Sequence, residues 1–136
     1  LPICHSFETT QGPEAGKALE HYIFLELLAY INLNLFDHKI SYWRTHTKLE
    51  VDFIIHLRNN EPIPIEVKIS ANLHKTNLVG IKAFMNEYGV KEGYIVCMEE
   101  ASRKIICDEG EIIILPVKEF LEKLWEGKIF SDTISI

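Results

Sequence analysis

The sequence has few cysteines, and none is in a pattern that would build a disulfide framework or a zinc site. The three, Cys4, Cys97 and Cys107, are an odd number without CxxC spacing, which fits ordinary thiols in a reducing compartment. No apolar run approaches the roughly 20 residues that cross a bilayer. The N-terminus also lacks the charged and apolar regions of a signal peptide. We therefore expect a cytoplasmic protein with no membrane partner.

Several common catalytic motifs are also missing. The six histidines form no HxxxH or HExxH arrangement, which argues against a zinc enzyme. No Ser or Cys nucleophile with a partnered His can be traced, and no Gly-rich loop of the Walker type is present. We expect this chain not to bind ATP by itself.

Excess positive charge is lacking too. The 136 residues carry 14 basic and 20 acidic side chains, a net charge of −6, which argues against coating nucleic acid by bulk charge. Many of the basic residues nevertheless fall between Lys39 and Lys82, and the C-terminal third is acidic. A local basic cleft is therefore compatible with the composition.

The length predicts one domain with a real core. Residues 1–12 have no periodicity, and the chain begins at Leu1 rather than Met. We interpret them as a linker or tail from a preceding domain, and 13–136 as the folded domain. The sequence is compatible with an oligomer but does not specify one.

Hydrophobic periodicity predicts an α/β (mixed α+β) domain with the order α-β-β-β-α-β followed by β-β-α. The first helix begins at Pro13. Its apolar face has one row of Leu19, Ile23, Leu27 and Ile31, and a second row of Phe24, Leu28 and Leu35. Strands are expected at 39–45, 49–57, 62–70, 93–98, 104–107 and 111–115. A second helix with Leu78, Ile81, Met85 and Tyr88 on one face ends at Gly89, and a closing helix runs from Val117 to Gly127.

Four charged residues interrupt the apolar pattern. Glu20 lies on the apolar face of the first helix, Asp52 lies in the second strand, and Glu66 and Lys68 lie in the third. Alternation predicts Val51, Phe53, Ile55 and Leu57 on one face of the second strand, and Glu50, Asp52 and Ile54 on the other. A buried charge is costly unless it is paired or binds a metal.

The hairpin register decides whether these charges meet. A two-residue turn at Asn59-Asn60 puts Asp52 opposite Val67 and mixes the two faces. A three-residue loop with Leu57 opposite Glu61 puts Asp52 opposite Glu66 and keeps the apolar faces together. We therefore predict an odd loop or a bulge, and a cluster of Asp52, Glu66 and Lys68 on one sheet face.

Two converging carboxylates repel each other unless a divalent cation lies between them. Two carboxylates, a backbone carbonyl and waters suffice for Mg²⁺. Lys68 beside such a metal could orient water and stabilise charge on a phosphoryl group, and Glu20 could supply a third carboxylate. This ligand set is typical of metal-assisted phosphodiester hydrolysis.

The pattern of Asp52, thirteen intervening residues and Glu66-Val67-Lys68, with Glu20 on the first helix, resembles the PD-(D/E)xK nuclease superfamily and its restriction-endonuclease-like core. Over about residues 14–129, the runs GKALEHYIFLEL, LEVDFII, PIEVK and ILPVKEFLEKLWEG are similar to the uncharacterised C-terminal domain of predicted AAA+-superfamily ATPases. Val51 stands where the superfamily's name has Pro.

The resemblance implies that Asp52, Glu66 and Glu20 bind Mg²⁺ or Mn²⁺ and that Lys68 is catalytic. It also implies that an ATPase domain of the same full-length chain is a partner and that DNA is the substrate.

Two alternatives stay open. Asp52, Glu66 and Lys68 could form a cross-strand ion pair on a solvated sheet face, and the whole domain could be a catalytically silent module that recognises DNA or protein. The candidate phosphate contacts are Arg44, Lys48, Lys75 and Lys82, each of which could instead be a solvated surface charge.

Overall fold

The structure is a computed structural model that describes residues 13–34, 36–58 and 61–130. The predicted linker at 1–12, with Cys4, lies outside these residues. A mixed six-stranded sheet has the strand order β1-β2-β3-β4-β6-β5. The elements are α2 (Pro13–Leu33), β1 (Lys39–Arg44), β2 (Glu50–His56), β3 (Ile63–Val67), the 3₁₀ turn η1 (Lys75–Leu78), α3 (Val79–Tyr88), β4 (Glu92–Cys97), β5 (Arg103–Cys107), β6 (Gly110–Pro116) and α4 (Val117–Trp125).

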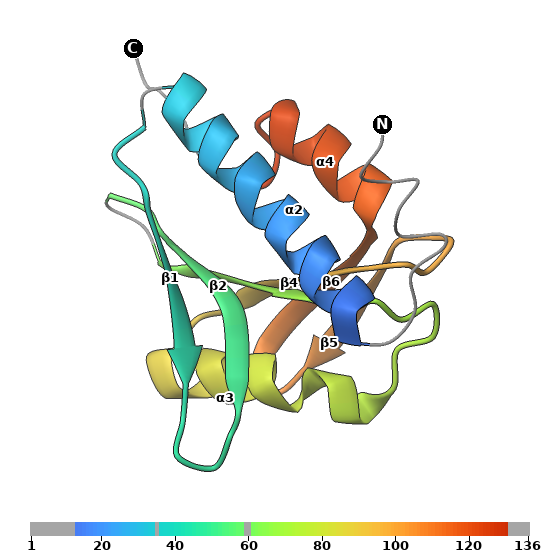
Figure 1. The fold of residues 1–136 in the computed structure, drawn as a ribbon. Coiled ribbons are helices and arrows are strands. Elements are labelled where there is room, and N and C mark those ends of the chain that lie inside the picture. Colours follow the sequence, from blue (N-terminus) through green and yellow to red (C-terminus); the bar gives the residue numbers. More distant parts are fainter. Residues whose placement is uncertain (1–12, 35, 59–60, 131–136) are drawn as a thin grey trace.

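The sheet is covered on both faces. Helices α2 and α4 lie on one side and α3 on the other (Figure 1). Strand β3 is antiparallel to β2 but parallel to β4, and β4 is parallel to β6. The α/β class and the predicted element order are confirmed. No helix in the described part of the chain has the length and hydropathy needed to cross a membrane.

Helix α2 buries a narrower stripe than its sequence predicts. All four residues of the first row, Leu19, Ile23, Leu27 and Ile31, are buried. The prediction that the second row is buried is wrong at Leu28, whose side chain is 37% exposed. A helix that lies on a sheet buries only the stripe of residues that faces the sheet. Leu35, in the same row, lies outside the described residues. Tyr88 at the end of α3 is likewise exposed rather than buried.

Strand β2 does not keep one alternation along its length. Phe53, Ile55 and Leu57 belong to the core beneath α2 and α4, whereas Val51 and Ile54 belong to the core beneath α3. The predicted grouping of Val51 with Phe53, and of Ile54 with the charged side, is therefore wrong.

A β-bulge explains the change of face. The pairing of β1 with β2 passes from Ser41 opposite Ile54 to Trp43 opposite Val51. Two residues of β2, Asp52 and Phe53, thus stand opposite one residue of β1, Tyr42. The additional residue reverses the alternation and redirects side chains.

Pro64 lies in an internal strand, where its missing N–H would normally break the ladder. It stands opposite Ile54 in β2, and β3 begins to pair with β4 one residue later, at Ile65 opposite Tyr94. The proline therefore precedes the doubly paired part of β3.

Two helical glycines provide a test of the packing around β2. A Cβ at Gly80 in α3 would lie 2.5 Å from the carbonyl oxygen of Glu50, whereas one at Gly16 in α2 would lie 3.6 Å from Ile69 Cγ2. We expect Gly80→Ala to lower the free energy of unfolding by about 1–3 kcal/mol, because rigid backbone must move. Gly16→Ala should raise it by about 0.5–1 kcal/mol through helix propensity. Urea denaturation measures both, and equal effects would contradict the close α3–β2 contact.

Candidate active site

The predicted register of β2 and β3 is confirmed. Phe53 stands opposite Ile65 and Ile55 opposite Ile63, the pairing that the three-residue loop requires, although residues 59–60 of that loop lie outside the described residues. The ladder ends at Phe53, where the bulge begins, so the predicted position of Asp52 opposite Glu66 stays a prediction. The Oδ2 atom of Asp52 accepts a hydrogen bond of 2.7 Å from the backbone N–H of Val67, so its side chain bridges the two strands.

Glu66 is a buried carboxylate with incomplete hydrogen bonding. Its side chain is 3% exposed, and its Oε2 atom is buried with no hydrogen-bond partner. Burial, followed by repulsion from Asp52 and Glu50, raises its pKa to about 8 against the attraction of Lys68. The alternative of a solvated sheet face is therefore wrong for Glu66, because α3 covers this side of the sheet.

Asp52 has a similar environment. Burial raises its pKa to about 6, and repulsion from Glu20 and Glu50 adds to the effect, while the bond from Val67 and the charge of Lys68 oppose it. Its carboxylate thus interacts with charges on α2, β2 and the end of β3. Two neighbouring carboxyl groups with raised pKa values are typical of functional sites.

Lys68 follows β3 directly and can reach Glu66. Its Nζ atom lies 3.7 Å from Glu66 Oε1, and its side chain is 34% exposed. Its backbone N–H donates to the carbonyl of Val96 in β4. The lysine therefore has a fixed backbone and a charged end that is open to solvent beside the buried carboxylate.

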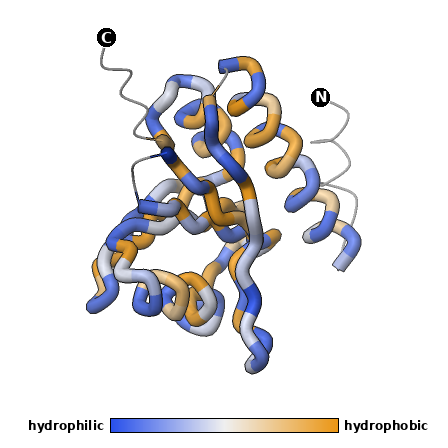
Figure 2. The backbone as a smooth tube through the Cα atoms, turned by 90° about the vertical axis from the view of Figure 1, so that its left-hand side faces the viewer, coloured by the Kyte–Doolittle hydropathy of each residue, from blue (hydrophilic) through white to orange (hydrophobic). Residues whose placement is uncertain are grey.

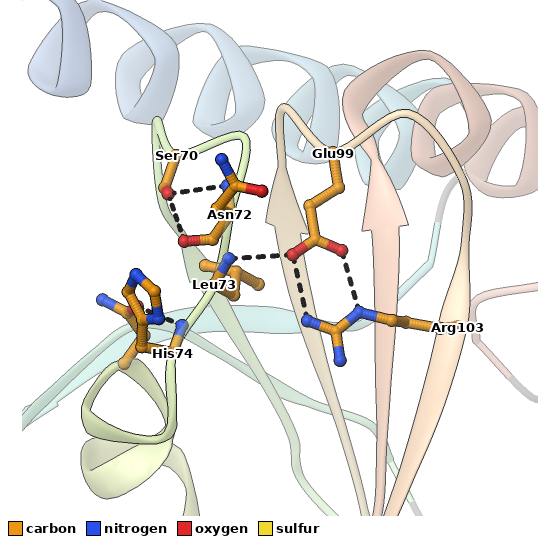
Figure 3. Close-up of polar contacts among 7 residues, drawn as sticks. Ser70, Asn72, Leu73, His74, Glu99 and Arg103 are labelled. Atoms are coloured by element: carbon orange, nitrogen blue, oxygen red, sulfur yellow. Dashed lines mark hydrogen bonds and ion pairs between the residues drawn. The ribbon is translucent and has the colours of Figure 1, made fainter.

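The loop after Lys68 is held in place by another carboxylate, that of Glu99 (Figure 3). Glu99 accepts two bonds from the guanidinium of Arg103 at 2.8 and 3.0 Å and one from the backbone N–H of Leu73 at 2.9 Å. These bonds hold its pKa at about 2. The backbone N–H of Met98 also donates to the carbonyl of Ser70. The segment that leaves the site is thus tied to the β4–β5 connection.

An open cleft of about 640 Å³ borders Asp52 on the α2 side. Its walls come from α2, β1 and β2, and Glu20 lines it together with Asp52. Sequence reasoning missed three other charged or titratable residues of this wall: Lys17, His21 and Glu50. Lys17 lies one turn before Glu20 on the same side of α2, which a helical wheel shows, but its place in the wall depends on how α2 lies on the sheet. Glu66 is not among the described lining residues.

The donor set suits a divalent cation only in part. Among the described residues, no group of three or more His, Cys, Asp or Glu side chains is arranged to hold a metal ion, so Glu20, Asp52 and Glu66 do not form such a group here. Two carboxylates with waters and a backbone carbonyl are nevertheless enough for Mg²⁺. The buried, unpartnered Oε2 of Glu66 fits a ligand atom, and the metal site stays a prediction.

Of the four predicted nucleic-acid contacts, Arg44 lies at the cleft. It lines the wall and pairs with Glu50 at 3.3 Å, with both side chains more than half exposed. Lys48, with a φ of 66°, lies in the exposed tip between β1 and β2, a hydrophilic projection in Figure 2. Lys75 begins η1 and is exposed, and Lys82 is half-buried on α3. Neither lies among the described residues of the cleft wall.

Comparison with known proteins gives a family but no activity. Residues 15–120 match the family described as "Domain of unknown function (DUF4143)". The chain belongs to the DUF4143 family. The match extends from α2 to α4 and so includes Lys68 and all three candidate carboxylates, Glu20, Asp52 and Glu66. No curated protein and no solved structure matches the chain.

Proposed function

We propose that this DUF4143 domain is a PD-(D/E)xK-type nuclease that hydrolyses DNA phosphodiesters with Mg²⁺ or Mn²⁺. The observation that carries the proposal is the carboxylate pair of the buried Glu66 and the partly buried Asp52. Asp52 and Glu66 repel each other, and one oxygen of Glu66 has no hydrogen-bond partner. Holding two carboxylates together in this way destabilises the fold, and a bound ligand of opposite charge would offset that destabilisation.

Each residue has a role that its position permits. Asp52 and Glu66 would hold the cation, which when bound neutralises charge on the phosphate and lowers the pKa of a water. Lys68, with its ammonium 3.7 Å from Glu66, would orient the attacking water and stabilise the developing charge. Glu20, across the cleft from Asp52, would position water from the α2 side.

The full-length protein would place this activity beside an ATPase. The similarity to the C-terminal domains of predicted AAA+-superfamily ATPases supports an ATPase domain on the same chain as the partner. A catalytically silent DNA- or protein-recognition module is the second candidate, and the exposed Arg44 beside the cleft favours it if cleavage is absent.

The decisive experiment is a nuclease assay with Mn²⁺ on single-stranded, duplex and branched DNA. We expect cleavage by the wild type and at least about a 100-fold loss in Asp52→Ala, because a metal ligand is removed. Asp108→Ala, in the exposed β5–β6 turn, is the matched control and should cleave normally. An inactive wild type, or an Asp52→Ala variant as active as the wild type, would exclude the nuclease and leave the recognition module.

A further inference from the structure

The β1 edge of the cleft carries an exposed aromatic ring that packing does not explain. Tyr42 is 71% exposed. Its neighbour Trp43 is half-buried and packs edge-on against Phe84 of α3, with ring centroids 5.5 Å apart. Trp43 therefore anchors β1 to the core, and Tyr42 contributes little to the core.

The bulge in β2 relates this ring to the candidate metal ligand. Tyr42 is the residue opposite the bulged pair Asp52 and Phe53, and Tyr42, Asp52 and Phe53 all line the cleft. Bulges commonly redirect side chains beside functional sites. One backbone irregularity thus accompanies both the carboxylate and the exposed ring.

The surroundings of Tyr42 combine aromatic and basic groups. The Arg44 guanidinium lies 5.6 Å from the Tyr42 ring centroid. Its ion pair with Glu50 is exposed on both sides, so little stability is lost if a phosphate replaces the carboxylate. On the opposite wall are Lys17 and His21 of α2.

An aromatic ring beside cationic groups is the arrangement with which proteins bind unpaired bases and their phosphates. In a duplex, the faces of each internal base are covered by its neighbours, so a protein ring can stack on one only by unstacking the helix, unless the base is unpaired or at an end. We propose that Tyr42 is a stacking platform for a base of single-stranded DNA, with Arg44 contacting the adjacent phosphate. The inference rests on the proposed function for its substrate, and it names single-stranded DNA as that substrate's class.

A binding experiment tests this separately from cleavage. Fluorescence anisotropy with Ca²⁺ compares a single strand of about 12 nucleotides, the same backbone without bases, and a fully paired linear duplex. We expect the wild type to bind the base-containing strand more tightly than the other two. Tyr42→Ala should weaken that binding at least about fivefold without changing binding of the abasic strand, and Tyr42→Phe should retain it.

The control is Trp125→Ala, which removes a 42% exposed aromatic from α4 outside the described wall of the cleft. It should bind as the wild type does, and thermal melting confirms that each variant is folded. The inference is overturned if the wild type binds none of the probes, if it prefers the duplex, if Tyr42→Ala binds normally, or if that variant loses the abasic strand equally. If binding shows the Tyr42-dependent preference for the base-containing strand but the wild type cleaves no DNA, only the proposed nuclease activity is excluded.

Discussion

Glu66→Gln should abolish hydrolysis and at the same time stabilise the protein. The wild-type side chain is 3% exposed and one of its oxygens has no hydrogen-bond partner. At alkaline pH the native state therefore contains an ionised carboxylate beside Asp52. Glutamine has nearly the same shape without the charge, so the repulsion disappears together with the ability to hold a cation.

The expected loss of Mn²⁺-dependent cleavage is at least about 100-fold. The expected gain in the free energy of unfolding at pH 9 is about 1–3 kcal/mol, because a tenfold change in proton affinity is worth about 1.4 kcal/mol. Cleavage assays and urea denaturation at pH 9 measure the two effects. A loss of cleavage together with a gain in stability distinguishes the removal of a metal ligand from simple unfolding of the variant.

Glu111→Gln is the matched control for this substitution. Glu111 forms an ion pair with Lys104 at 3.3 Å, and both side chains are more than 40% exposed. Such pairs contribute about 0–1 kcal/mol, so this variant should retain activity and nearly all stability. If Glu66→Gln instead cleaves DNA normally, or is less stable than the wild type at pH 9, the role assigned to Glu66 is wrong.

Without divalent cations, the stability of the wild type should fall as the pH rises from about 4.5 to about 8. Folding raises the pKa of Asp52 from 3.8 to about 6 and that of Glu66 from 4.5 to about 8. In this window the native state binds more protons than the unfolded state, so each increase in pH favours unfolding. Glu99 contributes to the pH dependence of stability with the opposite sign. Its pKa is lowered from 4.5 to about 2, so the stability it gives is lost as the pH falls from about 4.5 to 2.

A divalent cation should reverse the alkaline part of this profile. Near pH 7, Glu66 is largely protonated in the cation-free protein, so binding Mg²⁺ or Mn²⁺ must release about one proton. Thermal melting from pH 4 to 9, with and without Mn²⁺, measures the stability. Calorimetric titration in buffers of different ionisation enthalpy measures the proton.

Glu66→Gln provides the control for the pH experiment, since it should flatten the profile between pH 6 and 8 and abolish proton release. A melting temperature of the cation-free wild type that rises over this range would contradict the assigned pKa values. Binding of Mn²⁺ without proton release would place the cation elsewhere.

Local sequence patterns were sufficient for the secondary structure and for one long-range strand pairing. The helices begin and end near the predicted residues. Helix α3 ends at Gly89 as predicted, with a φ of 67° that glycine adopts without steric cost. The register of β2 with β3 was also predictable, because only one register keeps the apolar residues of two strands on one face.

The side of the sheet on which each residue of β2 lies was not predictable. Alternation assumes a regular strand, and nothing in the residues 50–56 signals the bulge opposite Tyr42. The sequence therefore grouped Val51 with Phe53, although the two residues lie in different cores. Lys17, His21 and Glu50 were missed because their roles depend on where α2 lies relative to β1 and β2.

By itself, the sequence determined the order of the elements and the register of β2 with β3, since each follows from periodicity and strand pairing. Only the tertiary structure decided that Glu66 is buried beneath a covered face and that Asp52 opens into a cleft shared with Glu20 and Tyr42. Burial and exposure depend on what packs over each face of the sheet, and this is a property of the whole fold.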